Sequence, residues 1–317
     1  MFTRKNSIVY YLFLGLCISA IAFSLAEYLS SWHRYFEFTT SYKLQFLLMG
    51  LCSLSYFLLT RRKLGIILCW FCIVINLAEI VPWYMNRPTI PDAEYQSLKA
   101  FSYNVLWSNK DYDRAIALVA KEQPDIAIFQ EVISGWSPAL TVLKPDFPYH
   151  SRSEKQEMEV YSKFPLLDPE IMFYGIYRGS IAVNLQIGDR KVKFVATHAY
   201  PQLYWGQGGW SIRNDQLHDL KEYAQNQPQP IVIMGDLNIS MWSPYYRSTI
   251  EGSGLRNARQ GFGILPTHSI VAPQFAALSA PLDHCLVSSD ILVKDFRLGS
   301  AIGSDHLPII AELLIKS

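Results

Sequence analysis

Residues 231–238 of the chain read IVIMGDLN, a short apolar run followed by polar residues. Four consecutive apolar residues predict a β-strand, and the positions after it are where a strand end borders a cleft. Asp236 and Asn238 are two positions apart, so on an extended chain we expect their side chains to share a face and to reach one water molecule together. The stretch therefore predicts a sheet whose strand ends carry the chemistry.

Further apolar runs in the C-terminal part also end on polar residues. Asn104 lies near the end of one run, Glu131 follows a second, and His198 follows a third. Each residue alone has an ordinary explanation, because polar residues after strands are often turn formers or helix caps. Since a sheet holds such residues rigidly at its edge, we expect the whole set to face one cleft.

Two short segments near the C-terminus add carboxylates and imidazoles: residues 282–284 read LDH and residues 303–306 read GSDH. Asp305 and Glu131 offer hard oxygen ligands of the kind that Mg²⁺ prefers. Asp305 and His306 would point apart on a strand, so a turn there would give one to a metal ion and the other to a substrate. Several carboxylates in one cleft would repel each other without a bound cation.

In the C-terminal part, short apolar runs alternate with amphipathic stretches. This pattern predicts a mixed α/β (α+β) domain with much antiparallel pairing. A hairpin is expected through Gly188 and Asp189, and Ser211 is the expected N-cap of the second helix. The predicted strands are residues 100–105, 125–129, 181–187, 192–197, 231–234, 285–287 and 309–315, and the predicted helices are residues 113–121 and 211–225.

The N-terminal part has a different composition. Its three apolar stretches, roughly residues 8–26, 44–60 and 64–85, are each near the length of about 20 residues that spans a bilayer as a helix. A cleaved signal peptide would explain only the first, and a buried core helix is the alternative for the third. We therefore expect a membrane anchor over residues 1–86, a linker over residues 87–97 and a catalytic domain over residues 98–317.

Basic residues predict the orientation of the anchor. Arg4 and Lys5 precede the first stretch, and Arg61, Arg62 and Lys63 join the second to the third. The positive-inside rule assigns both groups to the cytoplasmic face. Three spans of a cell membrane, inner or plasma, then deliver the catalytic domain to the extracytoplasmic side.

Charge argues against non-specific binding to nucleic acid. The chain has a formal net charge of +1, but the part from Asn86 onward carries 21 Lys/Arg against 24 Asp/Glu, a net charge of −3. Non-specific nucleic-acid binding usually depends on a basic surface. We find no block of like charge in this part that would supply one.

The ordered motifs YNV, QEV, THAYP, GDLN, LDH and GSDH run from Tyr103 to His306. In this set the chain resembles the endonuclease/exonuclease/phosphatase superfamily, which includes deoxyribonuclease I-like nucleases, inositol-phosphate phosphatases and neutral sphingomyelinases. The resemblance implies a four-layer α/β/β/α sandwich with the site at one end of two packed sheets. Abasic-site endonucleases of this kind carry an acidic residue where this chain has Leu106, which makes a role in DNA repair a poor match.

The resemblance also implies a role for each site residue. Glu131, Asp305 and Asn104 would hold Mg²⁺, with Mn²⁺ as an alternative ion. Asp236 would orient or deprotonate the attacking water and Asn238 would complete its motif, while Asp236 and His306 both remain candidates for the base. The implied site residues are Asn104, Glu131, His198, Asp236, Asn238, Asp283, Asp305 and His306, with His198 on a phosphate oxygen and Asp283 behind His306.

Four neighbouring features have competing interpretations. His284 is expected to be non-catalytic, and Glu157 or Glu159 is a candidate carboxylate partner of His198. Arg213 is expected to tie down the loop after the THAYP motif. The aromatic residues of this region are either loop packing or a lip over the site or at the membrane surface; they are Tyr200, Tyr204, Trp205 and Trp210.

The resemblance thus implies a metal-dependent phosphoric ester hydrolase that acts by direct in-line attack of an activated water. Its substrate is a phosphodiester or phosphomonoester, either a lipid head group or a small molecule. The alternatives are an extracytoplasmic nuclease acting on DNA or RNA, and a non-catalytic binding module on the same fold. The lipid bilayer is the expected partner of the N-terminal spans, and no protein partner is predicted.

Overall fold

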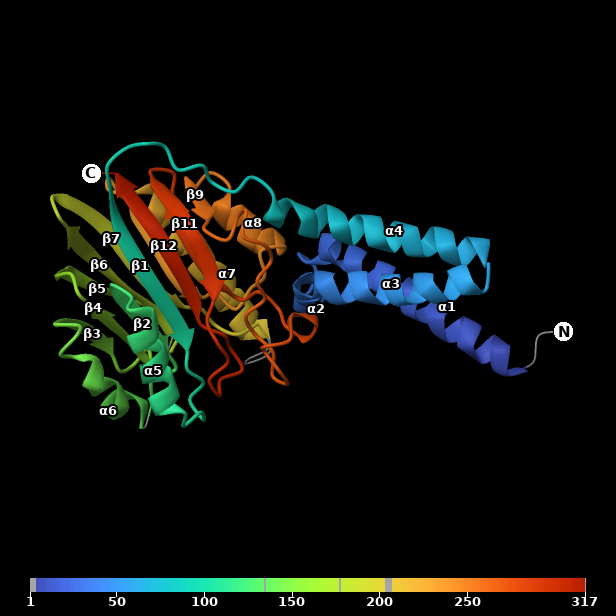
Figure 1. Ribbon diagram of the computed structural model, residues 1–317, viewed down its shortest axis with the longest axis horizontal. Helices are drawn as coiled ribbons and strands as arrows, with labels where there is room; N and C mark the ends of the chain where they lie inside the picture. Colours follow the sequence, from blue (N-terminus) through green and yellow to red (C-terminus); the bar gives the residue numbers. More distant parts are fainter. Residues whose placement is uncertain (1–3, 134, 177, 203–206, 317) are drawn as a thin grey trace.

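The computed structural model describes residues 4–133, 135–176, 178–202 and 207–316, and within them the chain forms two six-stranded sheets (Figure 1). The strand order is β11-β12-β1-β2-β4-β3 in the first sheet and β5-β6-β7-β8-β10-β9 in the second. The strands are β1 (Tyr95–Asn104), β2 (Ile126–Gln130), β3 (Tyr149–Ser153), β4 (Met158–Ser162), β5 (Leu166–Tyr174), β6 (Arg178–Ile187), β7 (Arg190–His198), β8 (Ile231–Asp236), β9 (Leu255–Asn257), β10 (Asp283–Ser288), β11 (Ile291–Leu298) and β12 (Ile309–Lys316).

Alternation along the strands places the two sheets face to face. Successive strand residues point to opposite faces, so Val232 and Met234 of β8 lie in the core between the sheets, whereas Ile231 and Ile233 face the outer helices. In β1, Ala100 points into the same central core. Both faces of each central strand are buried, which explains why these strands are almost continuously apolar.

Helices cover the outer face of each sheet and complete four layers (Figure 1). The first sheet packs its Phe101 and Phe129 against Trp136 and Leu118 of its helices, and the second packs Ile233 among the helices beside it. The helices of the domain are α5 (Tyr112–Glu122), α6 (Trp136–Leu140), η4 (Thr141–Leu143), α7 (Gln207–Gln225), α8 (Pro244–Ile250) and η5 (Ala276–Leu278). The architecture is the expected four-layer α/β/β/α sandwich.

Three N-terminal helical segments are long and apolar enough to cross a membrane, by length and composition: Ile8–Leu29, Arg34–Leu59 and Lys63–Tyr84. They project to one side of the sandwich (Figure 1). The elements are α1 (Arg4–Leu25), η1 (Ala26–Leu29), α2 (Arg34–Phe38), η2 (Thr39–Tyr42), α3 (Lys43–Leu59), α4 (Lys63–Ile80) and η3 (Val81–Tyr84). We call residues 4–84 the anchor.

The anchor is fixed to the sandwich by polar contacts at the end that faces it. Trp242 Nε1 donates to the carbonyl oxygen of Glu79 over 3.0 Å, and Thr40 Oγ1 lies 2.9 Å from Ser240 Oγ. The apolar cluster beneath α7 and α8 continues into the anchor through Ile80. The two parts therefore share one packed core.

The sequence predictions of elements were accurate for central strands and weaker elsewhere. The hairpin at Gly188 joins β6 and β7 as expected. The N-cap assigned to Ser211 was wrong, because α7 begins at Gln207 and Trp210 in its first turn donates to Glu37 of the anchor. The four edge strands β3, β5, β9 and β11 and the inner strand β4 were not predicted.

Candidate active site

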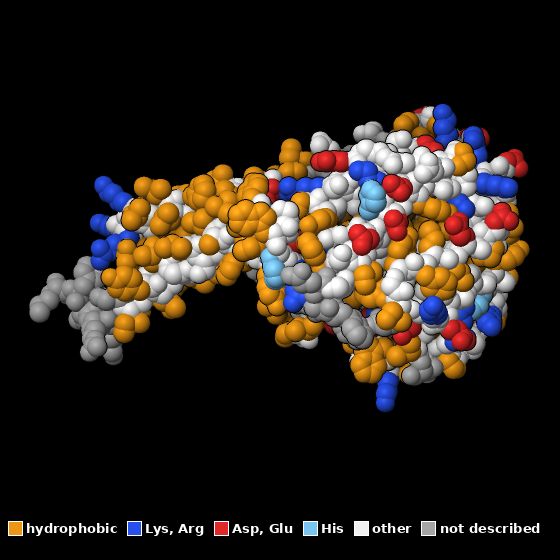
Figure 2. Space-filling view, turned by 180° about the vertical axis from the view of Figure 1, so that it is seen from behind, with side chains coloured by type: hydrophobic (Ala, Val, Ile, Leu, Met, Phe, Trp, Pro, Cys, Tyr) orange, Lys and Arg blue, Asp and Glu red, His pale blue; other side chains and the backbone are white. Residues whose placement is uncertain are grey.

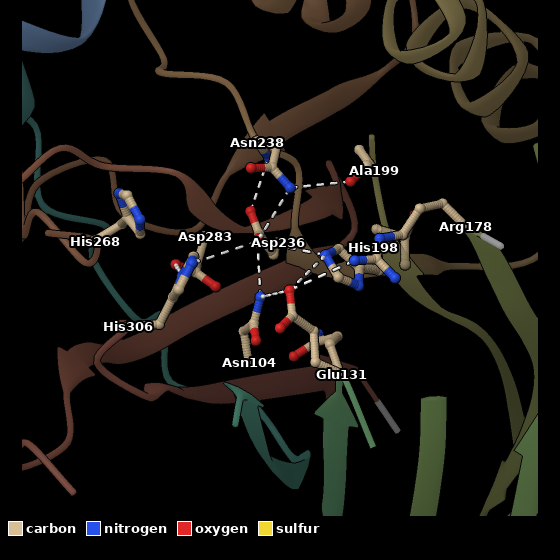
Figure 3. Close-up of polar contacts among 12 residues, drawn as sticks. Asn104, Glu131, Arg178, His198, Ala199, Asp236, Asn238, His268, Asp283 and His306 are labelled. Atoms are coloured by element: carbon tan, nitrogen blue, oxygen red, sulfur yellow. Dashed lines mark hydrogen bonds and ion pairs between the residues drawn. The ribbon is translucent and has the colours of Figure 1, made fainter. Parts of the chain in front are cut away.

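The candidate site lies where strands of both sheets end (Figure 3). In the first sheet, β1 ends at Asn104 and β2 ends at Gln130, so that Glu131 follows directly. In the second sheet, β7 ends at His198 and β8 ends at Asp236. The parallel pairing of β1 with β2 and of β7 with β8 brings these ends to one edge of the sandwich.

Strand register sets the neighbours of Asp236. His198 is its partner on the parallel strand β7, and Asp283 is its partner on the antiparallel strand β10. Asp236 therefore lies between an imidazole and a carboxylate that are held by the same sheet. Its own carboxylate is buried, with 1% of the residue exposed.

Gly235 allows this approach. Its φ is +148°, and a Cβ built on it would lie 1.9 Å from the carbonyl oxygen of Thr197 on the neighbouring strand. Only glycine has no side chain to clash there. The presence of glycine at this position of the GDLN motif is therefore explained by sterics alone.

Asn238 does not share an extended face with Asp236, and that expectation was wrong. Its φ is +50°, so the chain turns back after Asp236. The Asn238 backbone N–H donates to Asp236 Oδ1 over 2.8 Å and its Nδ2 donates to Asp236 Oδ2 over 3.2 Å. Asparagine tolerates the left-handed conformation and readily forms such local turns, which sequence periodicity does not reveal.

Asn104 joins the two sheets across the site. Its Nδ2 donates to Asp236 Oδ2 over 3.1 Å and to Glu131 Oε1 over 3.3 Å. Its Oδ1 accepts from the Leu106 backbone N–H over 3.1 Å. In this orientation Asn104 is a hydrogen-bond donor to the carboxylates, and its role as a metal ligand remains a prediction.

His306 and Asp283 form the expected pair, with His306 Nδ1 2.8 Å from Asp283 Oδ2. Burial opposes protonation of the imidazole, but the carboxylates of Asp283 and Asp236 outweigh it and raise the pKa of His306 to about 10. Burial likewise favours neutral Asp283, but the facing His306 holds the pKa of that carboxyl below its usual value. The pair is therefore an imidazolium–carboxylate pair at neutral pH.

Asp236 has the opposite shift. Burial and the neighbouring Asp283 carboxylate raise the pKa of Asp236 to about 7, although His306 acts in the other direction. His306 Nε2 lies 3.6 Å from Asp236 Oδ2. A carboxylate with a pKa near neutrality is suited to accept and release a proton during a reaction.

His198 is completely buried, and within the described residues neither of its ring nitrogens has a hydrogen-bond partner. Its Nε2 lies 3.6 Å from Asp236 Oδ2 and 4.0 Å from Glu131 Oε1 (Figure 3). Burial, with the charges of Arg178 and His306, lowers the pKa of His198 well below its usual value. A neutral imidazole with unpaired nitrogens is suited to meet a bound oxyanion, because an unpaired buried polar group is costly.

Glu157 and Glu159 do not support His198, so that prediction was wrong. Glu157 Oε2 accepts from Arg178 Nη1 over 2.9 Å, and Glu159 Oε2 accepts from the hydroxyl of Tyr161 over 2.7 Å. Strand β4 is antiparallel to β2, and this register directs Glu159 to the helix side of the first sheet, away from the second sheet. The sequence could not give this register.

The aromatic residues in and after the THAYP motif contact different parts of the molecule. The hydroxyl of Tyr200 accepts from the Ile176 backbone N–H, in agreement with loop packing, and Trp210 contacts the anchor. Tyr204 and Trp205 lie outside the described residues. Among the described residues, Arg213 donates to Glu37 of the anchor, which also accepts from Gln202 of this loop, and to the carbonyl oxygen of Asn238. Its link to the loop therefore runs through Glu37.

Two residues at the site were missed by the sequence reasoning. Arg178, at the start of β6, places Nη2 3.5 Å from Glu131 Oε1. His268 places Nε2 3.5 Å from Asp305 Oδ2, and its ring centroid is 4.6 Å from that of His306. The signal for Arg178 was its position three residues before a predicted strand, whereas His268 lies in a long loop that carries no periodic pattern.

The oxygen-rich donor set fits a divalent cation. Ligand atoms of Asp236, Asp283 and His306 lie within 4.8 Å of one another, and so do those of His268, Asp305 and His306; because a cationic His306 offers no lone pair, the carboxylates are the members of these groups that would bind a cation. Glu131 adds a carboxylate that accepts from Asn104 and from the Trp107 backbone N–H. Carboxylate oxygens are the ligands that Mg²⁺ and Mn²⁺ prefer.

A family profile described as "Endonuclease/Exonuclease/phosphatase family" matches residues 101–306. The chain belongs to this family. The match begins within β1 and ends at His306, so it includes every residue of the site described above. A search of the curated proteins gave no match.

Solved structures of the same fold were found. Truncated TDP2 of Caenorhabditis elegans has a TM-score of 0.57 at 20% identity, over 68% of this chain and 97% of that one. An endonuclease/exonuclease/phosphatase from Bacteroides vulgatus has a TM-score of 0.59 at 16% identity, over 69% and 99%. Sphingomyelinase C from Streptomyces griseocarneus has a TM-score of 0.51 at 19% identity, over 68% and 99%. At these identities the likeness concerns the fold.

Proposed function

We propose that the protein is a divalent-metal-dependent phosphoesterase that hydrolyses its substrate by in-line attack of water. The observation that carries the proposal is the convergence on Asp236 of groups from both sheets, namely Asn104, His198 and His306, with distances of 3.1–3.6 Å to Asp236 Oδ2. Family members named in the comparisons, such as sphingomyelinase C, are phosphoesterases.

Each group then has a role that follows from its charge. Asp236, held by Asn238 and Asn104, accepts a proton from the attacking water. His306, cationic beside Asp283, stabilises a phosphoryl oxygen or donates a proton to the leaving oxygen. His198 is neutral and hydrogen-bonds the phosphate. Donors aimed at developing negative charge are a major source of rate enhancement.

The metal would be held by Glu131, with Asp305 and Asn104 as further predicted ligands. When bound, a divalent cation supplies neutralisation of charge on the phosphoryl oxygens. The chain's own residues fix the positions of the carboxylates around the phosphate. Arg178 pairs with Glu131, and Asn104 donates to both Glu131 and Asp236. Mg²⁺ is the proposed ion because the predicted ligands are all oxygen donors.

The test uses the full chain in lipid nanodiscs with bis(p-nitrophenyl) phosphate and p-nitrophenyl phosphate. We expect hydrolysis with Mg²⁺ or Mn²⁺, its loss in EDTA, and a fall of about 10²-fold or more in Asp236→Asn. Glu131→Gln should need more Mg²⁺ for half-maximal rate. An Asp236→Asn variant as active as the wild type would remove Asp236 from the mechanism, and an unchanged metal titration would remove Glu131.

We further propose that the anchor spans a membrane with the catalytic domain on the extracytoplasmic side. Arg61 and Arg62 lie between α3 and α4, at the end of the anchor farthest from the sandwich, where Figure 2 shows a group of basic side chains. The positive-inside rule supports this orientation. Reporter fusions should report the cytoplasmic side at Lys63 and the extracytoplasmic side after Met85; any other pair of results would reject the orientation.

A further inference from the structure

A pocket of about 400 Å³ lies between the active site and the anchor. At one end it is lined by Asn238 of the GDLN motif and by His268, which contacts Asp305. Its other walls are mostly apolar, with Ser41, Gln202 and Ser269 as their polar members, and come from the anchor, from the segment after β7 and from the loop that leads to β10. They include Phe38, Tyr42, Ile270, Val271, Leu278 and Leu282.

The pocket therefore has the polarity of an amphiphile. Asn238 and His268, which connect it to the catalytic site, line it together with a larger number of apolar side chains. A volume of this size is in the range of small-molecule sites. Within the described part of the chain, no Lys or Arg lines it, so it offers nothing to pair with a second phosphate of a nucleic acid.

Its position relates the pocket to the membrane. Phe38 and Tyr42 belong to α2 and η2, at the start of the second apolar segment Arg34–Leu59. Gln45 at the start of α3 donates to the carbonyl oxygen of Ser279 beside η5. Figure 2 shows hydrophobic side chains of the anchor continuing to the edge of the catalytic domain. The pocket thus lies where the spans leave the apolar layer.

Exposed apolar side chains lie on the loop at the pocket and also after α1. Ile270 and Val271, on the loop at the pocket, are 83% and 77% exposed, and Trp32 and Tyr28, just after α1, are 77% and 75% exposed. Exposed apolar patches in soluble surroundings are unfavourable, whereas Trp and Tyr are enriched at membrane interfaces. A lipid surface accounts for both sets at once.

We infer that the substrate is a membrane lipid phosphoester whose phosphate lies at Asp236 and His306 and whose apolar chain lies in this pocket. The inference rests on the proposed function, because it names the substrate class of the same site. A buried ion pair between Glu37 and Arg213 fixes the anchor beside the GDLN turn, so the pocket is formed before a ligand arrives.

Binding of n-alkyl phosphates tests the pocket without requiring turnover. Methyl, butyl, octyl and dodecyl phosphate are titrated against the full chain in nanodiscs with Mg²⁺, and affinity is read from the rise in the thermal unfolding midpoint. Since a buried CH₂ is worth up to about fourfold in affinity, octyl phosphate should bind at least tenfold tighter than butyl phosphate.

Leu278→Gln and Ile270→Gln should reduce the increase in affinity with alkyl-chain length by about tenfold, because a polar side chain would then face the alkyl chain. Both side chains are more than half exposed, so neither change should prevent folding. The matched control is Val142→Gln, 58% exposed beside α6 on the outer side of the first sheet. Partition of the alkyl phosphates into the nanodisc is the same for all variants. An equal increase in affinity from butyl to octyl phosphate in Leu278→Gln, Val142→Gln and wild type would therefore overturn the inference.

Hydrolysis separates this inference from the proposed function. Leu278→Gln should hydrolyse phosphatidylglycerol vesicles about tenfold more slowly than the wild type, whereas Val142→Gln should hydrolyse both the vesicles and bis(p-nitrophenyl) phosphate like the wild type. Diester hydrolysis with no dependence of binding on chain length would overturn the lipid assignment and leave the phosphoesterase intact, as would faster hydrolysis of a single-stranded oligonucleotide than of vesicles. Binding that depends on alkyl-chain length, without hydrolysis of any phosphoester, would overturn the proposed function. It would also overturn the assignment of the lipid as a substrate.

Discussion

Glu37 and Arg213 form a fully buried ion pair in which Arg213 Nη2 lies 2.6 Å from Glu37 Oε2. Glu37 belongs to α2 of the anchor, and Arg213 belongs to α7 of the sandwich. Arg213 Nη1 also donates to the carbonyl oxygen of Asn238 over 3.1 Å. One guanidinium therefore links the anchor to the turn that carries Asp236, which makes the anchor part of the support of the site.

Glu37→Ala should destabilise the full chain by about 3–5 kcal/mol, because it leaves the Arg213 charge buried without its partner. The thermal unfolding midpoint in detergent should fall by about 10 °C. Activity of the protein that remains folded should also fall, since the Asn238 turn loses its tether.

Glu79→Ala is the matched control. It removes another contact between anchor and sandwich, the 2.7 Å pair with Arg247, whose side chains are 27% and 42% exposed. Exposed pairs are worth about 0–1 kcal/mol. An equal fall in the thermal unfolding midpoint for the two substitutions would show that the buried pair contributes no more stability than the exposed one.

The ends of the central strands could be predicted from sequence because they combine two local signals. A run of apolar residues marks a strand buried on both faces, and the polar residue after it marks the edge. This reasoning brought Asn104, Glu131, His198 and Asp236 to one place, where the structure also has them. Edge strands such as β5 lack that signal, because one side is exposed and Pro169 lies at a register shift between Leu167 and Glu170.

The contacts that support the site were not predictable in the same way. Glu37 and Arg213 are 176 residues apart, and nothing local to either indicates the other. Asn238 turns back on Asp236 because of one left-handed residue, which changes no hydrophobic pattern. His268 reaches the site only because its loop pairs with Ala280 and His306. Such contacts depend on how elements dock, which a single sequence does not encode locally.

Stability should depend on the ionisation of Glu159. Burial favours its neutral form, but donors outweigh this and hold the pKa of Glu159 below its usual value; they are His150, Ser137 and Tyr161. A carboxyl group with a lowered pKa in the folded state stabilises the fold above its unfolded pKa of about 4.3, and this contribution disappears as pH falls through the folded pKa. Thermal midpoints of wild type and Glu159→Gln should differ by on the order of 5 °C at pH 7.

The difference between the two midpoints should shrink as pH falls from 5 toward 3. Comparing the two proteins at each pH removes the contribution of the other carboxylates. A difference that stays constant from pH 7 to pH 3 would show that Glu159 acts through its shape and not through its charge.

Gly235→Ala should destabilise the fold by about 2–6 kcal/mol, since it adds backbone strain at a φ of +148° to a clash with the Thr197 carbonyl oxygen. Thermal unfolding of the full chain measures the effect. Gly208→Ala is the control, because a Cβ there meets nothing within 4 Å and lies in helix α7. Alanine in a helix is favoured by up to about 1 kcal/mol over glycine, so this variant should be neutral or stabilised. Similar midpoints for the two variants would mean that the strand adjusts and that the close approach is not required.

The proposed mechanism predicts a large loss of activity when His306 is replaced. As the cationic group 3.6 Å from Asp236 and paired with Asp283, it should act on charge that develops in the transition state. His306→Ala should therefore lower kcat by about 10²- to 10⁴-fold with a smaller effect on KM. Asp283→Asn should cost less in the same direction, since the imidazole remains but its orientation and basicity change.

The double variant decides whether His306 and Asp283 act as a unit. If they do, His306→Ala with Asp283→Asn should be scarcely slower than His306→Ala alone. His284, adjacent to Asp283, is buried and contacts Asn257 and the Ile239 carbonyl oxygen, so its loss should lower stability and not turnover per folded molecule. His218→Ala is the cleaner activity control, because that side chain is 67% exposed. Rate losses that multiply in the double variant would show two independent contributions, and an active His306→Ala would remove the imidazolium from the reaction.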